Sequence, residues 1–87
     1  MIEIRIRDSA FKHGITELQI GEVLADKYTT KPFELHDDEN SNPQEMLVGY
    51  TQSNVLLEIG VRYMDEWDEV FHANRVTAEY RALYEGK

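Results

Sequence analysis

The chain contains no cysteine among its 87 residues. This absence excludes a disulfide framework, a thiolate nucleophile and a cysteine-ligated metal. No apolar run approaches the ~18 residues that a membrane-spanning helix requires. The first seven residues alternate apolar and charged side chains, whereas a signal peptide carries a continuous apolar stretch. We therefore expect a cytoplasmic protein that has no membrane partner.

Basic residues are also scarce, because nine Lys and Arg stand against seventeen Asp and Glu and give a net charge of −8. Proteins that bind long nucleic acids without sequence specificity carry a basic surface, which this composition does not favour. Eight of the acidic residues lie in two windows, 37–45 and 65–69, that contain no Lys or Arg. The rest of the chain is therefore neutral, and a local basic face remains compatible with the composition.

The motifs that most often hold phosphates or metals are missing. No glycine-rich phosphate loop, nucleophile elbow or zinc pattern is present. Asp38, Asn40 and Asn42 alternate as the first ligands of a calcium-binding loop do, but Pro43 and Gly49 occupy the positions where that loop needs Gly and Glu. We therefore expect a solvated hairpin loop, and we predict neither a metal site nor a cofactor.

The first part of the chain predicts one strand and two helices. Ile2, Ile4 and Ile6 alternate with charged residues, as in a half-buried strand. Asp8 is placed to cap a short helix over residues 9–13. Thr16 and Gln19 form a capping box that begins a second helix, and Ile15 and Ile20 fit the positions of a hydrophobic staple around it.

The remainder predicts strands over residues 29–36, 46–50, 55–63 and 67–75, where apolar and polar residues alternate. Their short connections favour an antiparallel meander, since parallel neighbours need a crossover of about a dozen residues or more. Thr77 is a plausible N-cap for a final helix. The prediction is one α+β domain over residues 1–87. It has an antiparallel sheet of about four to five strands, two N-terminal helices and one C-terminal helix, with the helices on one sheet face.

Three stretches carry a resemblance to a known family: Lys12-His13-Gly14-Ile15-Thr16, Phe71-His72-Ala73-Asn74-Arg75-Val76 and Glu79-Tyr80-Arg81. In order and length, most of the chain resembles the BrnT-like toxins of bacterial type II toxin–antitoxin systems, which have a RelE-like fold. The resemblance implies a metal-independent ribonuclease that inhibits translation and growth. It also implies RNA as substrate, a cognate antitoxin protein as partner, and a homodimer or toxin–antitoxin hetero-oligomer.

Cleavage of RNA without a metal needs a base for the 2′-hydroxyl, cations for the phosphate charge and an acid for the leaving oxygen. We predict His13, Arg62 and Arg75 as the catalytic residues, with His13 chosen because it matches the family motif. A second set, Lys12, Arg81 and Tyr80, is predicted to bind the substrate.

Each candidate also has a structural interpretation. His13 fits a surface position before Gly14, Arg62 fits a cross-strand ion pair, and Arg81 is spaced to pair with Glu85. Tyr80 fits packing of the last helix onto the sheet, and for His72 we favour a structural role in its strand.

The family's paired arginines appear here as Asn74 and Arg75, and the protein is acidic rather than basic. The alternative function is therefore a non-catalytic interaction module of the same fold, which binds a basic partner through its acidic loops.

Overall fold

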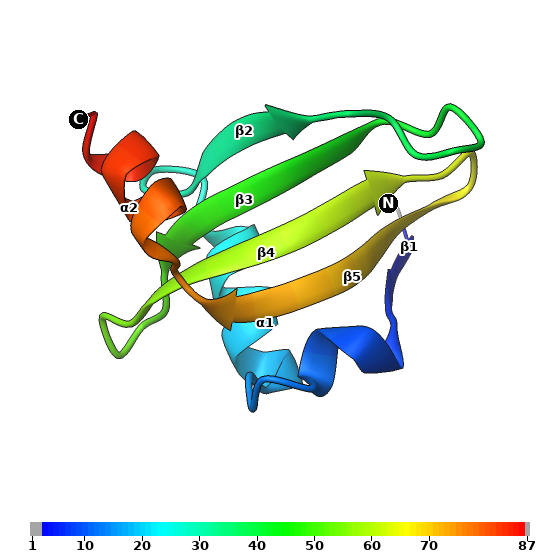
Figure 1. Cartoon of the computed structure of the whole chain (residues 1–87). Helices are drawn as coiled ribbons and strands as arrows, with labels where there is room; N and C mark the ends of the chain where they lie inside the picture. Colours follow the sequence, from blue (N-terminus) through cyan, green and yellow to red (C-terminus); the bar gives the residue numbers. More distant parts are fainter. Residues whose placement is uncertain (1–2, 87) are drawn as a thin grey trace.

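In the computed structural model, which describes residues 3–86, five strands form a single sheet (Figure 1). They are β1 (Glu3–Ile6), β2 (Lys31–Leu35), β3 (Gln44–Tyr50), β4 (Leu56–Tyr63) and β5 (Trp67–Arg75). The order across the sheet is β1-β5-β4-β3-β2. Strands β2 to β5 form the predicted antiparallel meander, and the short connections between them explain it.

Strand β1 departs from the prediction, because it pairs parallel to β5 and makes the sheet mixed. The whole chain between β1 and β5 serves as the crossover, so the alternation within β1 carried no information about its direction. Arg5 on β1 lies over the ring of Trp67 on β5, with its guanidinium carbon 4.0 Å from the ring centroid. Ile2, which the pattern also placed on this strand, lies outside the described residues.

The helices are one 3₁₀ turn, η1 (Asp8–Phe11), and two α-helices, α1 (Glu17–Ala25) and α2 (Ala78–Glu85). The prediction of two N-terminal helices is therefore wrong for the first one, which is a single 3₁₀ turn. Arg7 rather than Asp8 is its N-cap. The segment is short and leads to Gly14 at φ +80°, so no longer helix propagates. No helix among residues 3–86 is long and apolar enough to cross a membrane.

Helix α1 begins as the sequence predicts. The Thr16 hydroxyl accepts a hydrogen bond from the Gln19 N–H at 3.2 Å, and the Gln19 side-chain oxygen accepts one from the Thr16 N–H at 2.9 Å. Ile15 and Ile20 are both buried in the main core. Local pairing at the cap and burial at the staple positions together fix where the helix starts.

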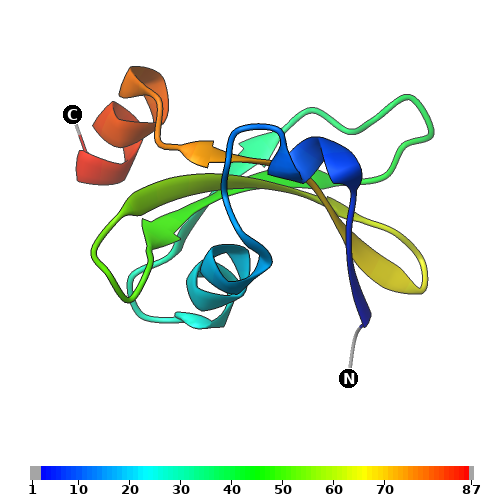
Figure 2. The same cartoon turned by 90° about the horizontal axis from the view of Figure 1, so that it is seen from below.

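The two α-helices lie on opposite faces of the sheet (Figure 2). The larger core lies between α1 and the sheet: Ala10, Ile15, Ile20, Val23, Leu57, Ile59, Val61, Val70 and Ala73. A smaller cluster on the other face contains Met46, Val48 and Leu56, and Tyr80 and Tyr84 of α2 pack against it. The prediction that all helices share one face is therefore wrong. These apolar residues of β3 and β4 face away from α1 and need a cover of their own.

A β-bulge in β5 changes which side chains face away from α1. Gly60 pairs with His72 while Val61 pairs with Val70, so Phe71 is an extra residue. A Cβ placed on Gly60 would lie 2.8 Å from the Phe71 ring and 3.0 Å from the His72 Cβ. Phe71 and His72 therefore both lie on the face opposite α1, which we call the open face. Bulges commonly redirect a side chain in this way.

Candidate functional site

Two histidines from distant parts of the chain meet at the open face. The rings of His13 and His72 are in edge contact, with centroids 5.8 Å apart and an interplanar angle of 71°. His13 reaches β5 because η1 is fastened to that strand, where the Ser9 hydroxyl donates a hydrogen bond to the Phe71 carbonyl at 2.8 Å. The bulge at Phe71 turns His72 toward it. The site therefore depends on the two structural features, η1 and the bulge, that position its histidines.

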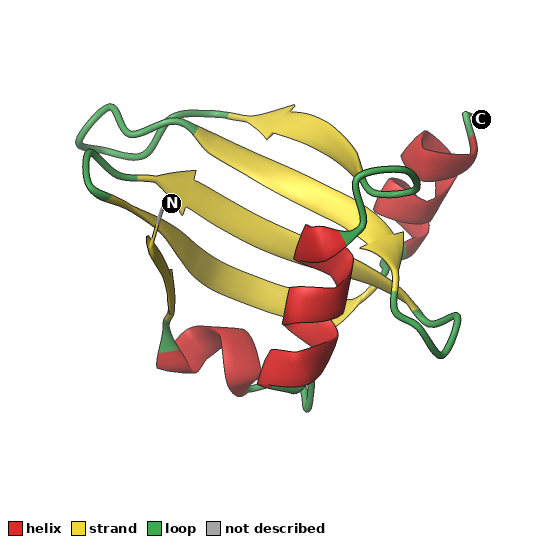
Figure 3. Ribbon diagram, turned by 180° about the vertical axis from the view of Figure 1, so that it is seen from behind, coloured by secondary structure: helices red, strands yellow, loops and turns green. Residues whose placement is uncertain are grey.

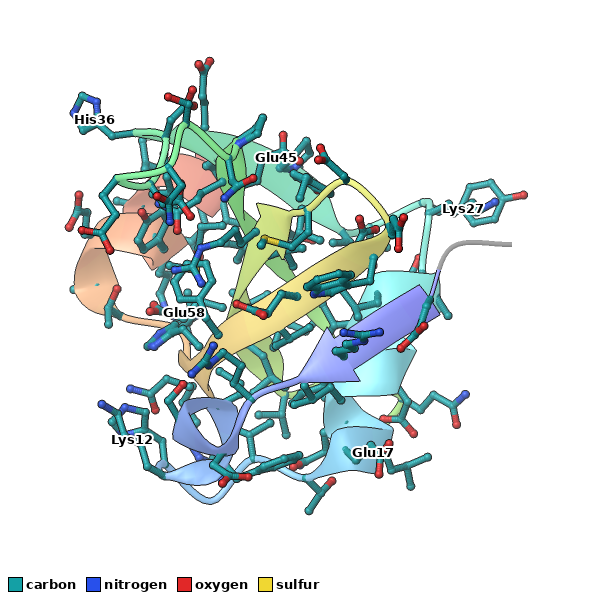
Figure 4. The ribbon with its side chains drawn as sticks, turned by 90° about the vertical axis from the view of Figure 1, so that its right-hand side faces the viewer. Lys12, Glu17, Lys27, His36, Glu45 and Glu58 are labelled. Carbon is teal, nitrogen blue, oxygen red and sulfur yellow. The ribbon has the colours of Figure 1, made fainter. Side chains whose placement is uncertain are left out.

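A buried carboxylate lies behind this pair. Glu58 is 3% exposed, and its Oε2 lies 2.9 Å from Nε2 of His72. Its other oxygen, Oε1, accepts the backbone N–H of Thr77 at 2.7 Å. Figure 4 shows Glu58 in the sheet, with Lys12 below it at the end of η1. The carboxylate fixes the orientation of the His72 ring and leaves the second ring nitrogen for another partner.

Arg75 and Arg81 come together in a second feature. Both line a surface pocket of about 380 Å³ at the junction of β5 and α2, with Asn54, Val55, Leu56 and Val76. Among residues 3–86, neither guanidinium forms an ion pair. Thr77, whose N–H binds Glu58, lies between the two arginines in the chain. Glu58 contacts His72 and the Thr77 backbone, whereas Arg75 lies in register with Leu57 of the larger core. The Arg75–Arg81 pocket is therefore a separate feature from the histidine pair.

Arg62 has a different environment from these two arginines. Its Nη1 lies 2.7 Å from Oε1 of Glu69, and its Nε lies 3.1 Å from Oδ2 of Asp38. The same Nε donates a hydrogen bond to the Gln44 side chain at 3.0 Å. The guanidinium is thus held by two carboxylates and one amide. This is the ion-pair role that was considered for Arg62.

The remaining candidates differ in exposure. Lys12 is exposed at the end of η1 beside His13. Tyr80 packs on Phe33 with ring centroids 6.2 Å apart, and burial raises the pKa of its hydroxyl. The ring of Tyr80 therefore helps to attach α2 to the sheet, whereas Lys12 is free to reach a ligand near the histidines.

The acidic loop between β2 and β3 is organised by Asp38. Its Oδ1 accepts the N–H groups of Asn40 and Asn42 at 2.9 and 2.8 Å, and its Oδ2 accepts the Asn42 side-chain amide at 3.0 Å. The Asn42 side chain and these backbone bonds lower the pKa of Asp38. Within residues 3–86, no three His, Asp or Glu side chains are grouped so as to hold a metal ion. The loop has the hydrogen-bonded turn structure of the hairpin that the sequence predicted.

Sequence reasoning passed over Glu58 and assigned His72 a structural role. Glu58 lies in the middle of β4, where apolar residues alternate with other types. A charged residue at such a position only weakly indicates a buried carboxylate with a specific partner. The contact between His13 and His72 left no local signal at all, because it joins segments 59 positions apart.

Comparison with known proteins gave no matching family model and no similar curated protein. The resemblance to BrnT-like toxins therefore stays a prediction from the sequence.

Proposed function

We propose that this protein is a metal-independent ribonuclease in which His72 is the general base and His13 is the general acid. The observation that carries this proposal is the edge contact of the two imidazoles, with the buried Glu58 carboxylate behind one of them. Two histidines of different exposure, one oriented by a carboxylate, suit opposite proton-transfer roles near neutral pH. The resemblance to BrnT-like toxins supports the same activity, with growth inhibition as its outcome and an antitoxin as partner.

In the proposed reaction, Nε2–H of His72 donates to Glu58, and Nδ1 takes the proton from a ribose 2′-hydroxyl. The 2′-oxygen then attacks the adjacent phosphorus, and the bond from phosphorus to the 5′-oxygen of the next nucleotide breaks. Protonated His13 gives its proton to that leaving oxygen. The products are a 2′,3′-cyclic phosphate and a free 5′-hydroxyl.

The reaction also requires a movement of His13 and cations that bind the RNA phosphates. The contacting rings leave no room for a phosphate between them, so His13 has to turn outward when RNA binds. The side chain of His13 is exposed, so its ring has room to rotate toward solvent. Arg75 and Arg81 have no ion-pair partner among the described residues, so their donors are available to bind a phosphate of the RNA chain. Lys12 adds a cation beside His13.

The experiment is induced expression in bacteria, with growth and bulk RNA followed together for the wild type, His72→Ala and Arg75→Ala. We expect the wild type to arrest growth and to produce RNA fragments with 2′,3′-cyclic phosphate ends. Each variant should lose about 10²-fold or more of the cleavage rate. His36→Ala is the matched control, since His36 is exposed and lies after β2, outside the histidine pair.

Full activity of His72→Ala would show that His72 is not the general base. Intact RNA and normal growth with the wild type would favour the second candidate, a non-catalytic module that binds a basic partner. The observation in favour of that candidate is that Arg62 forms ion pairs with Asp38 and Glu69. One of the three residues predicted to be catalytic is therefore held in a structural role.

A further inference from the structure

Helix α1 leaves part of its sheet face uncovered, next to the edge strand β1 (Figure 3). Two adjoining pockets of about 170 and 320 Å³ lie there and share Ile4 and Leu24. Their aliphatic lining includes Ile4, Ile6, Leu24, Leu47, Val61 and Val70. Ile4 is 51% exposed although it lines both pockets. We call this continuous depression between β1 and α1 the α1 groove.

The charged residues that line the α1 groove are both acidic. Glu17 is the first residue of α1, and Asp68 lies on β5. Among residues 3–86, the Asp68 carboxylate has no hydrogen-bond or ion-pair partner, and burial raises its pKa. Tyr63, which also lines the groove, donates its hydroxyl hydrogen bond to a third acid, Glu45. An apolar surface with unpartnered negative charge is complementary to a basic, amphipathic ligand.

We infer that the α1 groove binds an amphipathic basic helix of a partner protein. The aliphatic side chains of that helix enter between β1 and α1, and a Lys or Arg beside them pairs with Asp68. Binding of a helix in an apolar groove is a common mode of recognition. A second copy of this chain is a poor occupant, because each copy has a net charge of −8 and the groove itself is acidic. RNA is disfavoured for the same reason.

The groove is independent of the histidine pair. It lies on the α1 face of the sheet, whereas His72 and Glu58 lie on the open face. A helix bound in the groove therefore leaves both imidazoles accessible. Failure of the ribonuclease assignment would not affect this inference, and failure of this inference would not affect the ribonuclease assignment.

The test uses the full chain, labelled with ¹⁵N, and a synthetic helical peptide of Leu and Lys in an amphipathic pattern. A peptide with Glu in place of every Lys is the ligand control. We expect the Lys peptide to shift amide resonances of β1, α1 and the start of β5, and the Glu peptide to shift none. Asp68→Asn should weaken binding about tenfold, and Ile4→Asp should weaken it further.

Leu18→Asp is the matched control on the protein, because Leu18 is 72% exposed on α1 and does not line the groove. It should bind like the wild type. A second control neutralises Asp37 and Glu39 in the distant acidic loop. Equal weakening by that control and by Asp68→Asn would mean non-specific charge attraction and would overturn the inference. Shifts confined to the open face, or the absence of binding, would also overturn it.

Discussion

Arg62 and Arg75 look equivalent in the sequence, since each lies near the end of a predicted strand, but the fold gives them opposite environments. The Arg62 side chain is 22% exposed and contacts Glu69 and Asp38. Arg75 is exposed and forms no ion pair within residues 3–86. Strand register makes the difference, because Arg62 lies opposite Glu69 whereas Arg75 lies opposite Leu57. Availability for a ligand therefore depends on pairing across the sheet.

The largest effect on stability should come from removing the ion pairs that Arg62 makes with Glu69 and Asp38. Arg62→Ala leaves Glu69, which is 8% exposed, with only Arg7 at 3.7 Å. We expect the free energy of unfolding to fall by about 2 kcal/mol, because a carboxylate with little exposure loses its close partner. Arg75→Ala should change it by less than about 0.5 kcal/mol, as at an ordinary exposed site. Urea denaturation of both variants measures this difference, and equal losses would contradict the comparison.

A smaller loss of stability is expected when the Phe71 ring, over which Arg62 lies, is displaced by a substitution at Gly60. Its guanidinium carbon lies 4.8 Å from the ring centroid of Phe71, and that ring covers Gly60. In Gly60→Ala the new methyl would lie 2.8 Å from the ring, so we expect a loss of about 1–2 kcal/mol by overpacking.

The control for this prediction is Gly21→Ala in α1, where a Cβ meets no heavy atom within 4 Å. It should gain up to about 1 kcal/mol from helix propensity. Thermal unfolding compares the two glycines directly. A neutral Gly60→Ala would mean that Phe71 moves aside at no cost.

The smallest effect concerns the pH dependence of the Asp38 contribution. The folded-state pKa of this carboxyl is lowered, first by the Asn42 side chain and less by Arg62. Its contribution to stability is therefore present above the ordinary carboxyl pKa and is lost as the pH falls through the lowered value. Asp38→Asn should reduce the loss of stability between neutral and acidic pH. Parallel pH–stability curves for wild type and variant would contradict this.

Local signals in the sequence predicted much of the fold. The capping box at Thr16 needs only residues three positions apart, and the boundaries of β5 at Trp67 and Arg75 follow from turn residues and alternation. Short connections likewise fixed the meander. These features depend on neighbours in the chain, so a single sequence contains them.

The features that were missed depend on distant contacts. The direction of β1 is decided by its pairing with β5, more than 60 positions later. The bulge at Phe71 breaks the rule that side chains alternate, and this is why His72 did not stand out. Of the residues in the proposed site, the sequence named His13 and Arg75, whereas Glu58 and the bulge at Phe71 became visible only in the structure.

Trp67 is the only tryptophan in the chain, which gives the protein an intrinsic fluorescent reporter at one defined place. Its indole lies under the Arg5 guanidinium, and its Nε1–H is buried without a hydrogen-bond partner among the described residues. Detachment of β1 would remove the Arg5 cation from the ring and change the surroundings of the indole. Emission from Trp67 therefore reports opening of the β1 edge, which forms one wall of the α1 groove, separately from changes around the histidines.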